Sequence, residues 1–266
     1  MKNQVTTLLI RPAARGGKYL GHDAANEKNH SALIAILHRE TGKLVAHGLA
    51  VAPTPESAGP QNLMAPVSRS DPFAADASTV QVELEVEISE PADFRVLVYG
   101  PLKHIGQARL VQADITVLPG IDIGTNPQYP EGLVIEIPGL CISNVTANLQ
   151  GPQLSCFATV TMMCGCPIGN KPGWFWPNTD FSVQLVTCTQ SNATYFYPLQ
   201  FDDSPDIVSS FNGTWTNQAQ GDPVVQAWIY ASEPKLGNQG AYRIFPTPRL
   251  PSPLPDALKT ILEAEC

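Results

Sequence analysis

The stretch TVQVELEVEI, residues 79–88, decides the fold class. Valine, leucine or isoleucine at positions 80, 82, 84, 86 and 88 alternates with glutamine or glutamate at 81, 83, 85 and 87. A period of two over a full strand length predicts a strand with one face buried and the other in water. Phe94, Val96 and Val98 resume the alternation after a turn, so we expect a hairpin or a short connection between the two strands.

The rest of the chain shows the same kind of pattern. Two apolar runs flank Arg39-Glu40-Thr41-Gly42, and a short polar loop ending in glycine between such runs indicates a hairpin. With 25 prolines and 20 glycines spread along 266 residues, there is little room for long helices. Further strands are expected at 32–38, 43–50, 108–117, 133–137, 156–163, 181–187, 193–199, 224–231 and 241–245.

Short strands with regular turns predict an all-β chain of two antiparallel β-sandwich halves. In general shape both halves resemble immunoglobulin-like sandwiches, a resemblance of strand pattern alone that carries no functional residues. A short C-terminal helix is expected to begin at Pro255, with Leu258, Ile261 and Leu262 on one face.

Proline and glycine cluster at 138–152, and we place the boundary between the halves there. The N-terminal sandwich is expected at 1–138, with a long Pro/Ser-rich loop near 53–78. The C-terminal sandwich is expected at 139–266, and it carries all six cysteines and all four tryptophans.

The net charge of −8 lies entirely in the second part of the chain. Residues 1–110 carry 11 basic against 11 acidic side chains, whereas residues 111–266 carry 5 against 13. An acidic region cannot neutralise phosphates, so nucleic acid is not expected as a partner. No apolar segment approaches the length of a membrane span, about 18 residues. The N-terminus lacks the pattern of a signal peptide, so we expect a cytoplasmic protein, or a secreted or periplasmic one if a leader was removed.

The strongest candidates for a metal-binding or reactive site are Met162, Met163, Cys164 and Cys166, four sulfur-bearing side chains within five positions. On a strand the two cysteines project from the same face, and Gly165 permits a bend that brings the thiols closer. Soft thiolate and thioether donors favour copper or zinc as the bound metal. All five histidines lie in the first half, so a mixed Cys/His site requires both halves. Our leading hypothesis is a soft-metal site at these four residues, with no other cofactor.

Two alternatives stay open for the cysteines. Cys164 or Cys166 is a candidate catalytic nucleophile if its pKa is depressed, acting on a small aromatic or apolar substrate. Alternatively, the six cysteines are disulfide staples of a non-catalytic binding module, with Cys164 or Cys166 bonded to Cys141, Cys156 or Cys188.

A second candidate site is the aromatic loop Trp174-Phe175-Trp176, which follows the cysteine strand. Tryptophans in a loop flanked by proline and glycine can form a stacking platform for a small apolar or aromatic ligand or for a sugar. The alternative is that these rings plug the end of the sandwich and that Trp228 is its core tryptophan. Exposed edge strands also allow a homo-oligomer.

Overall fold

The computed structural model describes residues 2–16, 18–20, 30–51, 79–124, 132–171, 174–204, 207–217, 221–245 and 258–261. These residues form two compact units. Unit 1 contains the described residues up to 137 together with 258–261, and unit 2 contains those from 138 to 245. Residues 258–261, which we call the C-terminal turn, therefore belong to unit 1. They were expected in the C-terminal sandwich at 139–266. The Pro/Ser-rich loop expected near 53–78 lies outside the described residues.

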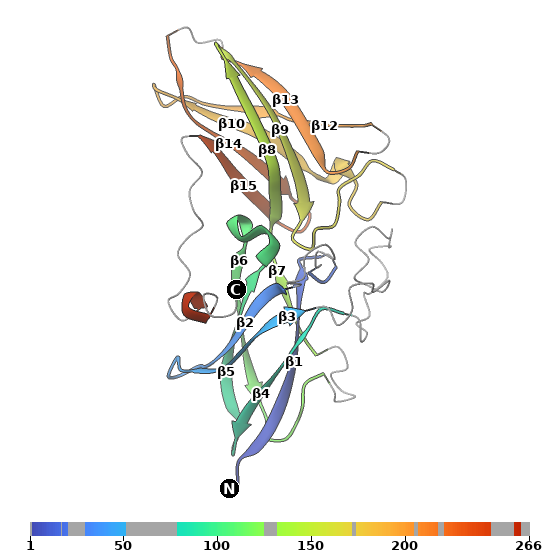
Figure 1. Ribbon diagram of the computed structural model, residues 1–266, viewed down its shortest axis with the longest axis vertical. Coiled ribbons are helices and arrows are strands. Elements are labelled where there is room, and N and C mark those ends of the chain that lie inside the picture. Colours follow the sequence, from blue (N-terminus) through green and yellow to red (C-terminus); the bar gives the residue numbers. More distant parts are fainter. Residues whose placement is uncertain are drawn as a thin grey trace. The chain divides into compact units, whose positions relative to one another are not determined.

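Unit 1 is a sandwich of a three-stranded and a four-stranded sheet (Figure 1). The strand orders are β4-β1-β7 and β3-β2-β5-β6. All pairs are antiparallel except β1 with β7, which is parallel. The elements are β1 (Gln4–Ala14), β2 (His30–His38), β3 (Leu44–Val51), β4 (Val82–Ile88), β5 (Ala92–Gly100), the 3₁₀ helix η1 (Leu102–Gln107), β6 (Arg109–Val117) and β7 (Leu133–Ile137).

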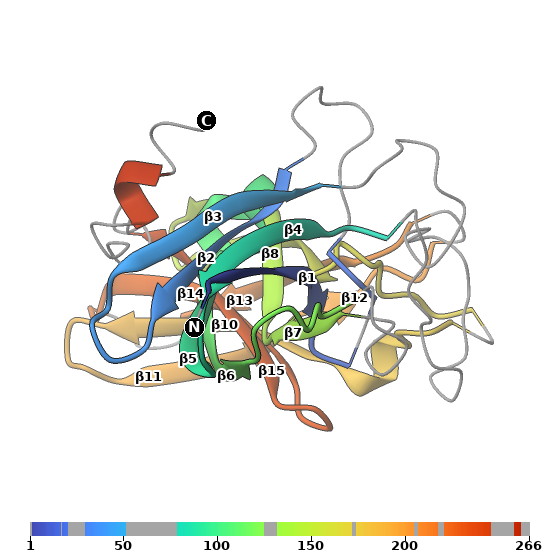
Figure 2. The same ribbon diagram turned by 90° about the horizontal axis from the view of Figure 1, so that it is seen from below.

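The alternating stretch forms β4 as predicted. Leu84 and Val86 are buried, whereas the three glutamates of the strand are exposed. Strand β4 runs beside β1, from Gln4 opposite Ile88 to Ile10 opposite Val82 (Figure 2). It does not pair with β5, because β5 lies in the other sheet between β2 and β6. The connection after β4 is therefore a short crossing between sheets and not a hairpin.

Unit 2 is a sandwich of two four-stranded sheets, with the orders β11-β10-β14-β15 and β12-β13-β9-β8. All of its strand pairs are antiparallel. The elements are β8 (Leu140–Gln150), β9 (Gln153–Met162), η2 (Asn178–Asp180), β10 (Ser182–Thr189), β11 (Thr194–Pro198), β12 (Gln200–Phe201), β13 (Ser210–Thr216), β14 (Val224–Glu233) and β15 (Asn238–Phe245).

The core of unit 2 follows from the alternation along its strands. In β9, every second side chain from Leu154 to Met162 is buried. In β14, Ala227, Ile229 and Ala231 are buried, and the side chains between them are partly exposed. Each sheet of the unit therefore has a clear inner face and a clear outer face.

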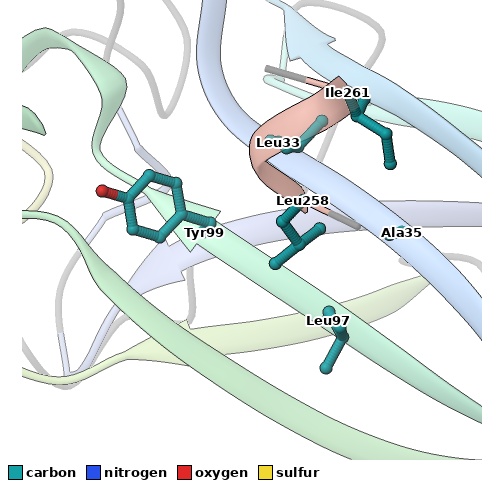
Figure 3. Close-up of a cluster of buried hydrophobic side chains, with 6 residues drawn as sticks. All are labelled: Leu33, Ala35, Leu97, Tyr99, Leu258 and Ile261. Atoms are coloured by element: carbon teal, nitrogen blue, oxygen red, sulfur yellow. The ribbon is translucent and has the colours of Figure 1, made fainter. Parts of the chain in front are cut away.

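A helical turn at 258–261 covers one face of the four-stranded sheet of unit 1 (Figure 3). Its Leu258 and Ile261 form one buried cluster with Leu33 and Ala35 of β2 and Leu97 and Tyr99 of β5. Strand β2 is thus buried on both faces, which explains why its sequence is a continuous apolar run.

The prediction of an all-β chain of two sandwich halves with a short C-terminal helix is confirmed. Among the described residues, no helix is long and apolar enough to cross a membrane.

Candidate functional site

The sulfur-rich segment is a tight turn at the end of β9. The strand ends at Met162, and the N–H of Gly165 donates to the carbonyl oxygen of Met162 at 2.8 Å. Gly165 has a φ of 81°, a left-handed conformation that glycine adopts without strain. The N–H of Met162 then donates to the carbonyl oxygen of Cys166 at 3.2 Å. The cysteines therefore lie in a bend and not along an extended strand, and Gly165 provides that bend as expected.

This turn brings Cys164 and Cys166 together as a disulfide with a Cα–Cα distance of 5.4 Å. Cys164 is 2% exposed and Cys166 is 1% exposed. The bridge joins the two cysteines of the turn to each other and not to Cys141, Cys156 or Cys188. A bridged sulfur carries no thiolate, and burial keeps reagents away from the bond.

Two further sulfurs lie beside the bridge. The Cys141 thiol at the start of β8 donates to the Met163 sulfur at 3.5 Å, and Met163 is buried. Met162 is also buried. Within the described part of the chain, no three His, Cys, Asp or Glu side chains are grouped so that they could hold a metal ion. A site built only from sulfur would have to include the methionines, because the bridge occupies two of the thiols.

The aromatic loop packs largely against the protein. Trp176 is 1% exposed, and its ring meets Phe175 edge-on with the centroids 4.9 Å apart. Trp174 is partly exposed and lies on Gly169, where an added Cβ would come within 2.7 Å of its ring atoms. The N–H of Gly169 donates to the carbonyl oxygen of Trp176 at 3.0 Å. Of the three rings expected to bind ligand, Phe175 and Trp176 are buried and Trp174 is partly exposed.

Sequence reasoning missed a row of side chains that crosses the outer face of sheet β11-β10-β14-β15. Phe196 lies opposite Val186, Val186 lies opposite Trp228, and Trp228 lies opposite Arg243. Phe196 is 65% exposed, and the other three are partly exposed. Tyr230 follows Trp228 on the same face of β14. We call these five residues the aromatic face.

The position of Trp228 contradicts the alternative that this residue is the core tryptophan of the sandwich. Ala227 and Ile229 fill the core, so the alternation of β14 turns Trp228 outward. The guanidinium carbon of Arg243 lies 5.9 Å from the centre of the Trp228 ring. That distance is within the range of a cation–π interaction. The alternation of β14 could have revealed Trp228 and Tyr230, but the register with Phe196 and Arg243 is a tertiary property.

The outer face of the other sheet is different in character. A shallow hollow of about 340 Å³ lies over β8, β9 and β13. Phe157 is the only aromatic residue in its described lining, and the remaining side chains are small or uncharged and polar.

Comparison with known proteins gives only distant similarities. No family model matches the chain, and no curated protein matches it. A DUF3823 family protein from Bacteroides ovatus is similar at 11% identity and a TM-score of 0.30, covering 90% of this chain and 96% of its own. The tip fimbrial protein Mfa3 from Porphyromonas gingivalis, with a C-terminal truncation, is similar at 11% identity and a TM-score of 0.28, covering 96% and 84%. No residue role or activity is transferred from these proteins to this chain.

Proposed function

We propose that this chain is a non-catalytic binding module whose aromatic face holds a ligand with a flat, ring-shaped apolar surface, such as a sugar. The observation that carries the proposal is the exposed row from Phe196 to Trp228. Burying a phenylalanine side chain stabilises a protein by about 1.5–3 kcal/mol, and Phe196 forgoes most of that gain. Contiguous apolar surface of this kind is characteristic of interaction sites.

The chemistry of the face favours binding over catalysis. The described strand residues on the whole outer face of sheet β11-β10-β14-β15 include no carboxylate and no histidine. Cys188 and Tyr230 are the titratable side chains there besides Arg243. General acid–base chemistry needs a group whose pKa lies near the working pH, positioned against a reacting atom. Open rings with flanking glutamines such as Gln184 suit stacking and hydrogen bonding instead.

The disulfide of the turn supports a structural role for Cys164 and Cys166 and an oxidising compartment for the protein. Disulfides persist in secreted and periplasmic proteins and are rare in the cytosol. A bond this deeply buried stabilises the turn between β9 and the aromatic loop. We therefore propose a secreted or periplasmic location in place of the cytoplasmic one expected from the N-terminus.

Affinity electrophoresis through gels containing xylan, mixed-linkage β-glucan or galactomannan tests the binding proposal. We expect at least one polysaccharide to retard the protein, and Phe196→Ala to weaken that binding about fivefold to tenfold, the equivalent of one stacking contact of about 1–1.5 kcal/mol. Phe157→Ala is the matched control, since it removes a partly exposed ring from the opposite sheet. Equal loss in the two variants, or loss in Phe157→Ala alone, contradicts the proposal.

A second candidate function is soft-metal binding by the reduced protein. It is favoured by the 3.5 Å contact between the sulfurs of Cys141 and Met163, next to the bridge. Because the bond is buried, a phosphine is applied to the protein unfolded in urea, which is then refolded. The phosphine gives two electrons to the disulfide and takes the oxygen of one water, whose protons complete two thiols. Thiols with a thioether suit Cu(I). We expect reduced protein to bind about one equivalent of Cu(I), the oxidised protein none, and Cys141→Ser to bind more weakly. Equal uptake by both redox forms would refute a site at this turn.

A further inference from the structure

Arg243 gives the aromatic face a positive charge, and no carboxylate of the described strand residues on that face balances it. The described strand residues of the outer face of sheet β11-β10-β14-β15 include this one basic side chain and no acidic one. The Nε atom of Arg243 is enclosed and makes no hydrogen bond to the described residues. Lys235, another cation of unit 2, is paired with Asp180 at 2.6 Å. Arg243 is therefore a cation that no carboxylate among the described strand residues of this face neutralises.

Trp228 holds that cation in place. The guanidinium carbon lies 5.9 Å from the centre of the indole ring, on the neighbouring strand. A guanidinium that rests against an aromatic ring keeps its planar edge of N–H donors available, and that edge matches a carboxylate in a bidentate arrangement. The ring and the cation together therefore fit a ligand that carries an anionic group next to an apolar surface.

The dimensions of the row favour an extended ligand lying flat. Phe196 and Arg243 lie on the two outermost strands of the four-stranded sheet. Three inter-strand spacings therefore lie between them, a distance of about 14 Å. This length exceeds one sugar ring. The row lies across the face of the sheet and not along its edge, so a ligand there contacts side chains and does not extend the backbone ladder. That geometry favours a short saccharide over a peptide strand.

We propose that the ligand of the aromatic face is an acidic saccharide, with a carboxylate held by Arg243 and sugar rings stacked on Trp228 and Phe196. This inference rests on the proposed binding function. The chain as a whole carries a net charge of −8, which repels an anionic ligand at long range. Recognition of the acid must therefore be local, and it depends on this arginine.

Titration with trigalacturonic acid and with its fully methyl-esterified form tests the inference, because the two probes share rings and differ in charge. We expect the wild-type protein to bind the acid about tenfold more tightly than the ester, as hydrogen bonds between charged groups allow. Arg243→Gln should remove this preference, so that the variant binds the acid and the ester with affinities within about twofold of each other. Arg243→Lys should restore only part of the preference, because a point charge lacks the planar fork.

Controls separate the two proposals. Phe196→Ala should weaken binding of both probes alike, and Lys235→Gln should change neither. If acid and ester bind equally, and both depend on Phe196, the proposed function stands and the role of Arg243 is refuted. If neither probe shows binding that depends on Phe196, both proposals fail. If an oligoglutamate peptide displaces the acid through Arg243 at lower concentration than the saccharide itself, the occupant is an acidic peptide and the inference is overturned.

Discussion

Removing one side chain from the C-terminal turn tests how strongly that turn stabilises unit 1. Leu258 is 1% exposed and packs with Leu33 and Leu97 beneath the turn (Figure 3). Replacement by alanine removes three buried carbon groups, which at about 0.8 kcal/mol each amounts to about 2–3 kcal/mol. The turn is short and can shift to fill the space, so we expect little additional cost from a cavity.

The loss has an upper limit that makes the prediction sharper. Once the turn has detached, further weakening of its contacts does not lower the free energy of unfolding of unit 1 any more. Leu258→Asp should therefore destabilise unit 1 only by the full docking energy of the turn, which the burial of Leu258 and Ile261 sets at about 3–6 kcal/mol. Lys259→Ala, on the exposed side of the same turn, is the matched control and should cost less than about 1 kcal/mol.

Urea unfolding followed by two probes measures the effect. All four tryptophans lie in unit 2, so their fluorescence reports that unit and serves as an internal reference. Hydrogen exchange at the amides of β2 reports unit 1. With a slope of about 2 kcal/mol per molar urea, Leu258→Ala should lower the midpoint of unit 1 by about 1–1.5 M. A shift in the tryptophan transition with β2 unchanged would show that the turn does not stabilise unit 1.

Three more changes test unit 2. Gly165→Ala places a side chain at a φ of 81° and should lower the free energy of unfolding by about 1–2 kcal/mol, measured by urea unfolding of oxidised protein; an unchanged midpoint would mean that the turn is not held in this conformation. Burial raises the pKa of the Cys156 thiol to about 11, so the folded protein keeps this thiol protonated where the unfolded chain has lost its proton. The contribution of the protonated thiol to the free energy of unfolding should be fully present below pH ~9 and be lost as the pH rises toward 11. In urea titrations at several pH values, Cys156→Ala should therefore show a smaller fall in the free energy of unfolding across that window. Asn238→Ala removes the acceptor for the Gly139 N–H at 2.9 Å and a donor to Glu233, and should cost about 1–3 kcal/mol in thermal unfolding, unless water replaces both bonds.

The fold could be predicted where burial differs between the two faces of a strand. In β4 and β9, polar and apolar residues alternate because one face packs on the core, and the sequence records that difference. Strand β13 was missed because Asn212 and Gly213 weaken the pattern. Its glycine is kept by close packing, since an added Cβ would lie 3.0 Å from the Leu199 side chain. Such a strand is defined by its neighbours more than by its own residues.

The candidate site was predictable only in part. The spacing of Cys164 and Cys166 around a glycine indicated that their sulfurs could meet, and they do. Nothing in that spacing tells a bridged pair from a metal-bound one. The aromatic face depends on the register of four strands and on a bulge between Ala227 and Trp228. This register could not be predicted from the single sequence.

The position of the C-terminal turn has a consequence for the order in which the chain folds during its synthesis. Strand β2 emerges early from the ribosome, yet the residues that cover its second face, 258–261, are made after every strand of unit 2. Unit 1 therefore keeps an apolar face uncovered until after β15, the last strand of unit 2, has been made. We expect the second unit to complete its folding first, an order opposite to the N-terminal-first course common in multidomain chains.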